Sequence, residues 1–256
     1  MTVHYETDGA VAIVTIDRPE VANAVDRVTA DELFEMFERF DGDPDLSAAV
    51  LTGARGKFCA GADLKAIFDG RGNIVTLEGN GPLGATRMLL SKPVIAAVEG
   101  HAVAGGLELA LWCDLRVAAR DATFGVYCRR WGVPLCDGGT VRLPRLIGLS
   151  HALDMILTGR AVGAEEAARM GLVNRLCEPG EALATACRLA KALARLPQTC
   201  LRSDRRSAYE QSALELGDAL RRETELGLAV IGSGETMSGI GRWAGGAWSF
   251  AEFADA

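Results

Sequence analysis

Up to about residue 195, short apolar runs alternate with segments of helical periodicity. Residues 11–16 (VAIVTI) form a short β-branched run, whereas residues 29–40 carry apolar side chains at the three- and four-residue spacing of an amphipathic helix. This alternation is typical of an α/β fold. The patterns predict strands at 11–16, 48–52, 93–98, 114–118 and 173–176, and helices at 29–40, 63–68, 84–90, 106–112, 150–157, 164–170 and 181–196.

Two stretches depart from this alternation. Residues 69–82 are rich in glycine and predict a mobile loop. From residue 197 onward, the chain shows only helical patterns and a glycine-rich tail. We therefore expect an α/β core over residues 1–195 and a helical C-terminal region over residues 196–256.

Charge and hydropathy exclude several classes of function. The formal net charge of −7 argues against non-specific binding of nucleic acid. The most apolar stretch, residues 94–113, is interrupted by Glu99, His101 and Glu108, so it predicts a buried segment and no membrane span. The N-terminus has neither the basic start nor the apolar stretch of a signal peptide, which predicts a cytoplasmic protein.

Cysteine and histidine usage gives no sign of a metal site. The chain has seven cysteines without a CxxC pair, which is typical of reduced, mostly buried thiols. Its three histidines, His4, His101 and His151, are too far apart in sequence for an HxH or HxxxH pair. We expect no protein-bound metal.

Two loops of small residues open into helices. In the first, FCAGADL at 58–64, small side chains let a ligand approach the backbone, and the N–H groups at the following helix start are unpaired. A plain strand-to-helix turn remains the alternative. In the second, at 100–111, Gly105 falls in the first helical turn and Glu108 one turn later on a similar face. Glu108 could simply complement the helix dipole, but its apolar neighbours favour a functional carboxylate.

Together the two loops suggest a chemistry. Two backbone N–H donors can hold one thioester oxygen and stabilise the negative charge of an enolate. A nearby carboxylate can then move a proton.

Five motifs occur in order along the chain. They are LTGARGKFCAGADL at 51–64, KPVIAAVEGHAVAGGLELALWCDLRVAA at 92–119, FGV at 124–126, GGTVRLPRLIG at 138–148 and LTGRAVGAEEAARMGLVN at 157–174. Through them the chain resembles the enoyl-CoA hydratase/isomerase (crotonase) superfamily over about residues 11–196. The resemblance implies a spiral of β-β-α units followed by C-terminal helices that close the pocket and mediate assembly into a trimer or a hexamer (dimer of trimers).

The resemblance also implies roles for individual residues. Ala62 and Gly105 match the two oxyanion-hole donors, and Glu108 matches the first of two catalytic glutamates of hydratases. The substrate is an acyl-CoA thioester, so coenzyme A arrives with it and no separate cofactor is expected. The positions expected to bind the substrate are Ala22, Ala24, Ala60, Asp63, Leu64 and Lys65.

Three positions depart from the hydratase pattern. Cys128 stands where hydratases carry their second glutamate, and a thiol, with a reference pKa of about 8.5, is a weak proton donor at neutral pH. Asp137 lies in the glycine-rich segment beside the reacting carbon, where it either supplies the second carboxylate or caps the helix that follows. The C-terminal residues 245–253 lack the basic segment of many hydratases.

These departures leave three interpretations open. The first is a lyase, an enoyl-CoA hydratase of fatty-acid or related acyl-CoA metabolism, in which Glu108 activates water and Asp137 replaces the second glutamate, with Cys128 beside them. The second is double-bond isomerisation or another enolate reaction that needs only one carboxylate. The third is a non-catalytic acyl-CoA-binding protein that keeps the fold.

Overall fold

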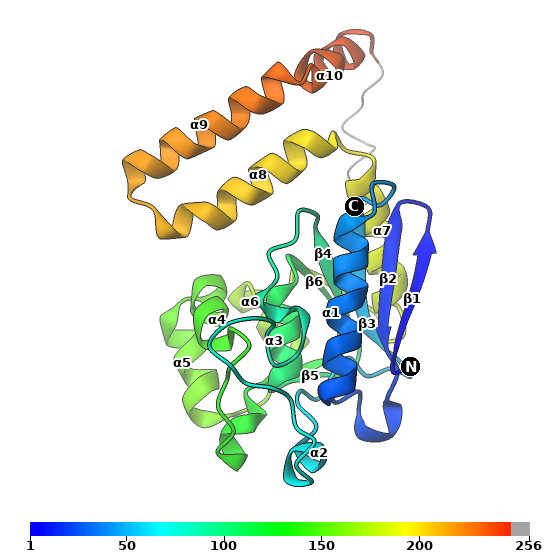
Figure 1. The fold of residues 1–256 in the computed structure, drawn as a ribbon, viewed down its shortest axis with the longest axis vertical. Helices are drawn as coiled ribbons and strands as arrows, with labels where there is room; N and C mark the ends of the chain where they lie inside the picture. Colours follow the sequence, from blue (N-terminus) through cyan, green and yellow to red (C-terminus); the bar gives the residue numbers. More distant parts are fainter. Residues whose placement is uncertain (247–256) are drawn as a thin grey trace.

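A six-stranded sheet forms the centre of the molecule (Figure 1). The computed structural model describes residues 1–246. The strands lie in the order β1-β2-β3-β4-β6-β9, with β1 and β2 antiparallel and all later neighbours parallel. They are β1 (Val3–Asp8), β2 (Val11–Ile16), β3 (Ala48–Gly53), β4 (Val94–Val98), β6 (Leu115–Ala119) and β9 (Arg175–Cys177).

Helices cover both faces of this sheet (Figure 1). Successive side chains of a strand point to opposite faces, so β3 contributes Leu51 to one side and Val50 to the other. Leu51 belongs to the core beneath α1 (Arg27–Gly42), whose Phe37 is fully buried there, and Val50 belongs to the core beneath α7 (Ala182–Ala194). This double coverage explains why the central strands are apolar at almost every position.

A second, three-stranded sheet fixes the start of α3 (Gly105–Trp112). It contains β5 (His101–Val103), β7 (Thr123–Gly125) and β8 (Val162–Gly163), with β5 parallel to β7. Just after β5, the N–H of Ala104 donates to the carbonyl of Gly125 at 2.8 Å. The direction in which α3 leaves the sheet is therefore set by hydrogen bonds to β7.

Shorter helices surround this central unit. The N–H of Ala66 donates to the Asp63 carboxylate, which caps the start of α2. Gly171, at a positive φ of 86°, ends α6 in a left-handed conformation. The bounds are α2 (Leu64–Phe68), α4 (Gly139–Ile147), α5 (Leu149–Thr158) and α6 (Ala164–Met170), with 3-10 turns at Pro19–Val21, Ala85–Arg87 (η2) and Tyr127–Trp131 (η3).

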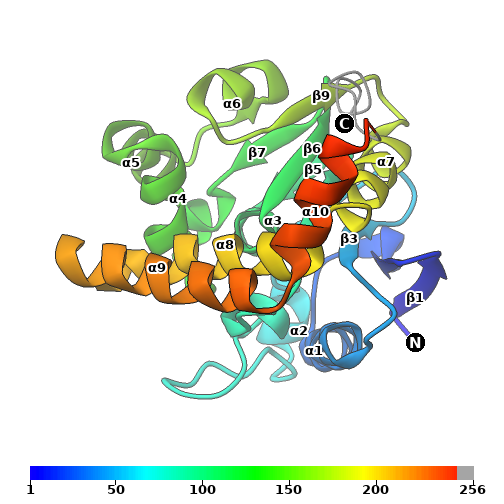
Figure 2. The same cartoon turned by 90° about the horizontal axis from the view of Figure 1, so that it is seen from above.

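Three C-terminal helices project from the core as a separate layer (Figures 1 and 2). They are α8 (Gln198–Glu210), α9 (Leu216–Gly232) and α10 (Glu235–Ala244). Arg205 and Tyr209 of α8 bind the carboxylate of Asp114, at 2.8 and 2.7 Å, and so attach this layer to the core beside β6. Residues 247–256, which include most of the non-basic C-terminal segment, lie outside the described residues.

The predicted fold class is confirmed as far as an α/β core followed by a C-terminal helical region. Each of the five predicted strands is present, although the last one occupies residues 175–177 and not 173–176. The predicted helices at 29–40, 63–68, 106–112, 150–157, 164–170 and 181–196 are also present within a few residues.

Near the site, one predicted helix is wrong and one helix was not predicted. The expected helix at 84–90 is only the single turn η2, because Gly84 has a φ of +79° and packs so closely on α1 that a Cβ would lie 2.0 Å from the Ala30 carbonyl. Helix α4, which begins at Gly139, was not among the predicted helices, whereas the helix predicted at 150–157 corresponds to α5. Pro144 lies inside α4, and burial of Leu143 and Ile147 holds the helix together across the lost backbone hydrogen bond.

Candidate active site

The two small-residue loops lie against each other. Cys59 and Ala102 form an isolated parallel bridge, in which the Cys59 N–H donates to the His101 carbonyl at 2.9 Å and the Val103 N–H donates to the Cys59 carbonyl at 3.2 Å. The first loop is held on its other side as well, since the Val25 N–H donates to the Gly61 carbonyl at 2.8 Å. Residues 58–64 therefore lie between the chain near Val25 and the start of α3.

Two glycines permit this close approach. Gly61 has a φ of +93°, and a Cβ there would lie 2.5 Å from the backbone nitrogen of Gly105. A Cβ on Gly106 would lie 2.0 Å from the Cys59 carbonyl oxygen. Both distances are below van der Waals contact with rigid backbone atoms, so no other residue fits at either position.

The N–H groups of Ala62 and Gly105 are available to a ligand. Gly105 is the first residue of α3, and Ala62 directly precedes Asp63, the cap of α2, so neither N–H has an intrahelical acceptor. Within residues 1–246, neither group donates a hydrogen bond. A Cβ built on Gly105 would lie only 3.4 Å from the Ala62 nitrogen. This arrangement can hold one oxygen atom between two donors.

A cavity of about 310 Å³ opens next to these donors. Glu108, Cys128 and Asp137, which come from three different segments, all line it together with Ala62 and Gly105. Most of the remaining wall is apolar, as expected for a site that excludes water around a reacting group. The other lining residues are Ala60, Leu64, Ile67, Asn73, Val75, Pro82, Leu83, Val103, Ala104, Tyr127, Trp131, Val133, Pro134 and Cys136.

Glu108 is a buried carboxylate held by the start of α4. Its side chain is 3% exposed, and its Oε1 accepts hydrogen bonds from the N–H groups of Asp137 and Gly139, at 2.9 and 2.8 Å. Burial raises the pKa of Glu108 to about 7, and the charge of Asp137 adds to the increase while the Gly139 N–H opposes it. Such a carboxyl group can take up or release a proton near neutral pH.

Asp137 does not cap α4, so the capping interpretation is wrong. Gly138 occupies the cap position, and the Asp137 Oδ1 instead accepts hydrogen bonds from the Leu83 N–H, at 2.9 Å, and from the Thr86 hydroxyl. Within the described chain, its Oδ2 has no hydrogen-bond partner. Burial raises the pKa of Asp137, and the bonds from Thr86 and Leu83 oppose this increase. The structure therefore leaves Asp137 as a second carboxyl group at the cavity.

Two thiols complete the polar wall. Burial raises the pKa of both Cys128 and Cys136, and the negative charge of Glu108 raises each of them further. Both side chains are thus neutral at physiological pH. Cys128 lines the cavity, as the sequence predicted, and Cys136, which was not among the predicted site residues, lines it as well.

The predicted substrate-binding residues divide into two groups. Ala60 and Leu64 line the cavity, and the Ala60 N–H donates to the Ala22 carbonyl at 3.1 Å, which places the Ala22 loop beside it. Asp63 and Lys65 are not among the described residues that line the cavity.

Arg18 organises this side of the site. Its guanidinium donates to the Ala24 carbonyl at 2.5 Å and binds the carboxylates of Asp63 and Asp26 at 3.0 and 3.1 Å. The salt bridge to Arg18 and the cap on α2 occupy the Asp63 side chain, so it supports the loop that carries Ala24 and Ala62.

Several residues of the site were not predicted. Gly139 binds Glu108 through its N–H, and Leu83 and Thr86 hold Asp137. Gly138-Gly139 does carry the signal of the other two loops, small residues at a helix start, but Leu83 and Thr86 come from a segment with no such pattern. Within residues 1–246, no group of three His, Cys, Asp or Glu side chains is placed to hold a metal ion.

The close approach of the loops yields a prediction. Gly61→Ala should lower kcat/KM for the expected acyl-CoA substrate on the order of 10²-fold, because its methyl group would lie on the Gly105 N–H donor. Gly180→Ala is a matched control: its φ of +89° imposes the same backbone strain, but no atom lies within 4 Å of the added methyl. Equal losses in both variants would attribute the effect to backbone strain and not to the donor.

Comparison with known proteins places this geometry in a family. Residues 6–244 match the family model for enoyl-CoA hydratase/isomerase. Enoyl-CoA hydratase EchA19 of Mycobacterium tuberculosis is 36% identical over 239 residues, which cover 91% of this chain and 90% of that protein. Carnitinyl-CoA dehydratase of Escherichia coli is 41% identical over 194 residues, 75% of this chain and 74% of that protein.

Solved structures agree with the sequence matches. The crystal structure of an enoyl-CoA hydratase from Mycobacterium tuberculosis superimposes with a TM-score of 0.90 at 40% identity, covering 95% of each chain. That of enoyl-CoA hydratase EchA1 from Mycobacterium marinum gives a TM-score of 0.90 at 38% identity with the same coverage. With matches over nearly its whole length, the chain belongs to the enoyl-CoA hydratase/isomerase family of the crotonase superfamily.

Proposed function

We propose that this hydratase-type enzyme adds water reversibly to the double bond of a 2-enoyl-CoA. The observation that carries the proposal is the buried Glu108 carboxylate, whose pKa is raised to about 7, in the same cavity as the free N–H groups of Ala62 and Gly105. Relatives named enoyl-CoA hydratase and carnitinyl-CoA dehydratase support this reaction type.

In the proposed reaction, the thioester oxygen binds between the N–H groups of Ala62 and Gly105. Glu108 takes a proton from a water molecule whose oxygen attacks the β carbon. The electron pair of the double bond then moves toward the thioester oxygen, and the two donors stabilise the enolate that forms. A neutral Glu108 could not do this, so its ionised form is the active one.

Asp137 is the proposed donor of the second proton. Its Oδ1 is held by Leu83 and Thr86, whereas its Oδ2 has no partner in the described chain, and its raised pKa favours the protonated form. A proton on Oδ2 can pass to the α carbon of the enolate. Transfer of a proton from Glu108 back to Asp137 then resets both groups. Cys128 lines the same cavity as a neutral thiol and is too weak an acid to replace it.

Coenzyme A is part of the substrate in this proposal, and no separate cofactor is needed. Ala22 and Ala24 lie on the loop beside Ala60, and the proposal assigns the binding of the coenzyme to this loop. No described helix is both long and apolar enough to cross a membrane. A cytoplasmic location stays an expectation from the sequence.

We also infer assembly into a homotrimer or a dimer of trimers. The C-terminal layer supports this, because large apolar side chains of α9 and α10 face solvent in the single chain. They include Leu216, Leu220, Leu228, Ile231, Met237, Ile240 and Trp243. Light scattering on the purified protein should give three or six chains per particle, and a monomer at micromolar concentration would contradict the inference.

The function is tested with wild type and Glu108→Gln on a 2-enoyl-CoA. Wild type should form the 3-hydroxyacyl-CoA, and the variant should lose about 10²-fold or more in kcat while keeping affinity for the substrate. The kcat/KM of wild type should fall about tenfold per pH unit below about 7, because Glu108 must be ionised, and should fall again at higher pH once Asp137 loses its proton.

Product identification separates the alternatives. Conversion of a 3-enoyl-CoA to the 2-enoyl isomer without hydration would replace the proposal with isomerisation. Tight binding of both esters without turnover would identify a non-catalytic binder.

Asp137→Asn isolates the second carboxyl group. Asparagine keeps the oxygen that accepts hydrogen bonds from Leu83 and Thr86 but removes the acidic proton. The kcat should therefore fall on the order of 10²-fold, with the unfolding temperature Tm nearly unchanged. Cys128→Ala, in the same wall, should cost far less. An unchanged rate for Asp137→Asn would leave Asp137 as a residue that only positions Leu83.

A further inference from the structure

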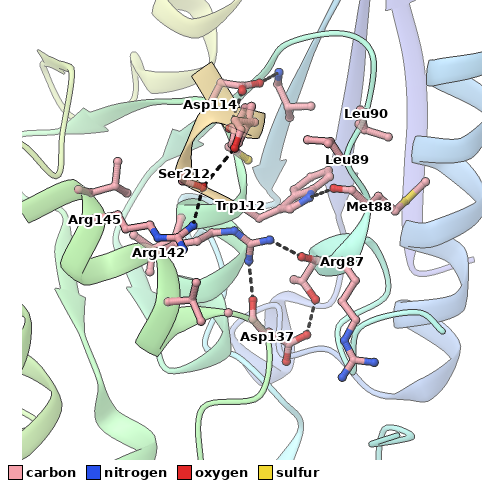
Figure 3. A pocket seen from close by; sticks show the side chains of 18 of the residues that line it. Arg87, Met88, Leu89, Leu90, Trp112, Asp114, Asp137, Arg142, Arg145 and Ser212 are labelled. Carbon is pink, nitrogen blue, oxygen red and sulfur yellow. Dashed lines mark hydrogen bonds between the residues drawn. The ribbon is translucent and has the colours of Figure 1, made fainter. Parts of the chain in front are cut away.

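A second and larger cavity, of about 810 Å³, adjoins the first (Figure 3). Cys136 and Asp137 line both cavities and so form part of the wall between them. The second cavity lies between the core and α8, since Trp112 and Arg142 line it from one side and Tyr209 from the other. Figure 3 shows the Arg142 guanidinium above Asp137, to whose backbone carbonyl it donates a hydrogen bond of 2.8 Å.

Helices α3 and α4 both lead from the first cavity to the second. Along α3, Gly105 and Glu108 line the first cavity, and Leu111 lines the second. Glu108 and Leu111 are three residues apart, which corresponds to about 4.5 Å along the helix axis. Along α4, Gly139 donates to Glu108, and Arg142 lines the second cavity one turn later. The second cavity therefore begins about one helical turn beyond the proposed catalytic carboxylate.

In the described chain, Arg142 and Arg145 line this cavity without a salt-bridge partner, whereas the guanidinium of Arg87, which also lines it, points away and donates to the Thr76 carbonyl at 2.8 Å (Figure 3). None of these three arginines forms a salt bridge within residues 1–246. Arg142 is partly buried and uses its guanidinium on two neutral groups, the backbone carbonyls of Asp137 and Thr86, at 2.8 and 2.6 Å. Among residues 1–246, the only hydrogen bond of the Arg145 side chain is to the Ser212 hydroxyl, at 3.4 Å.

Among the described residues, the carboxylates that line the cavity form no salt bridge with these arginines, although the charges of Arg87 and Arg142 lower the pKa of Asp137 against the increase that burial causes. The Oδ1 of Asp114 already binds Arg205 and Tyr209, and its Oδ2 accepts from the Val94 N–H. Asp137 has a raised pKa and makes its contacts with Leu83 and Thr86. A guanidinium keeps its charge in proteins, and its planar donors match a carboxylate group closely. The cavity thus offers an anion site with apolar residues, such as Leu111 and Leu135, on the way to it.

We propose that this second cavity binds the distal end of the substrate's acyl group and that this end carries a carboxylate. The inference rests on the proposed function, because the thioester must first be placed at Ala62 and Gly105. The acyl chain then passes Glu108 and the Asp137 wall, its methylene groups contact the apolar part of the cavity, and its terminal carboxylate meets Arg142 and Arg145. The preferred substrates are CoA esters of dicarboxylic acids.

The test compares two saturated esters that bind without reacting, hexanedioyl-CoA and hexanoyl-CoA. They have the same chain length, and only the first carries a distal carboxylate. Calorimetry on the full-length protein should give a Kd at least about tenfold lower for hexanedioyl-CoA, which corresponds to one charge-assisted contact of about 1.4 kcal/mol. The ratio should fall as salt is raised.

Substitutions assign the preference to the arginines. Arg145→Gln and Arg142→Gln should each bring the ratio of the two Kd values close to one, whereas Arg188→Gln, on α7 away from both cavities, should keep it. Arg142 also holds Thr86 and Asp137, so its substitution also affects the packing of the site. If Arg142→Gln does not fold, the result for Arg145→Gln decides the test.

The outcomes separate this inference from the proposed function. Equal affinity of wild type for both esters, or a preference that survives Arg145→Gln, would overturn the carboxylate subsite alone. Failure of both esters to bind would overturn the acyl-CoA site itself. Binding of free hexanedioate together with hexanoyl-CoA, with no preference between the esters, would assign the cavity to a separate anion and would also overturn the proposal.

Discussion

The contact between two backbone loops is the constraint on which the rest of the site depends. The segment at 58–64 and the start of α3 approach so closely that Gly61 and Gly106 have no room for a Cβ. This contact places the N–H groups of Ala62 and Gly105 side by side without any side chain taking part. Backbone donors held by rigid strands and helices do not need to reorganise during a reaction, which is the condition under which they stabilise developing charge best.

Helix α4 influences both the ionisation of Glu108 and the position of the charged groups next to it. Its first N–H, from Gly139, binds the carboxylate, and this contact limits the rise in pKa that burial causes. One turn later, Arg142 holds the backbone at Asp137 and Thr86. The same helix thus orients the proposed base, supports the proposed acid and contributes Arg142 and Arg145 to the second cavity. Its N-terminal dipole acts in the same direction, since it favours the ionised form of Glu108.

Local sequence patterns predicted the large elements well and the short ones poorly. The amphipathic stretch at 29–40 and the run VAIVTI gave α1 and β2, because their side-chain periodicity reflects which face is buried. Strands β5, β7 and β8 have two or three residues each, too few for any periodicity. The helix predicted at 84–90 was too long, because Gly84 packs against α1, and helix α4 was not predicted, because tertiary packing holds it together across Pro144.

By itself, the sequence determined the α/β fold class, the family and the two loops with Ala62, Gly105 and Glu108, because each depends on residues close together in the chain. Only the tertiary structure decided how distant residues act. It showed that Asp137 binds Leu83 and Thr86, more than 50 residues away, and does not cap its own helix. It also placed Arg87, from η2, and Arg142 and Arg145, from α4, along one cavity. These features depend on contacts between residues far apart in the sequence, and local side-chain patterns do not encode such contacts.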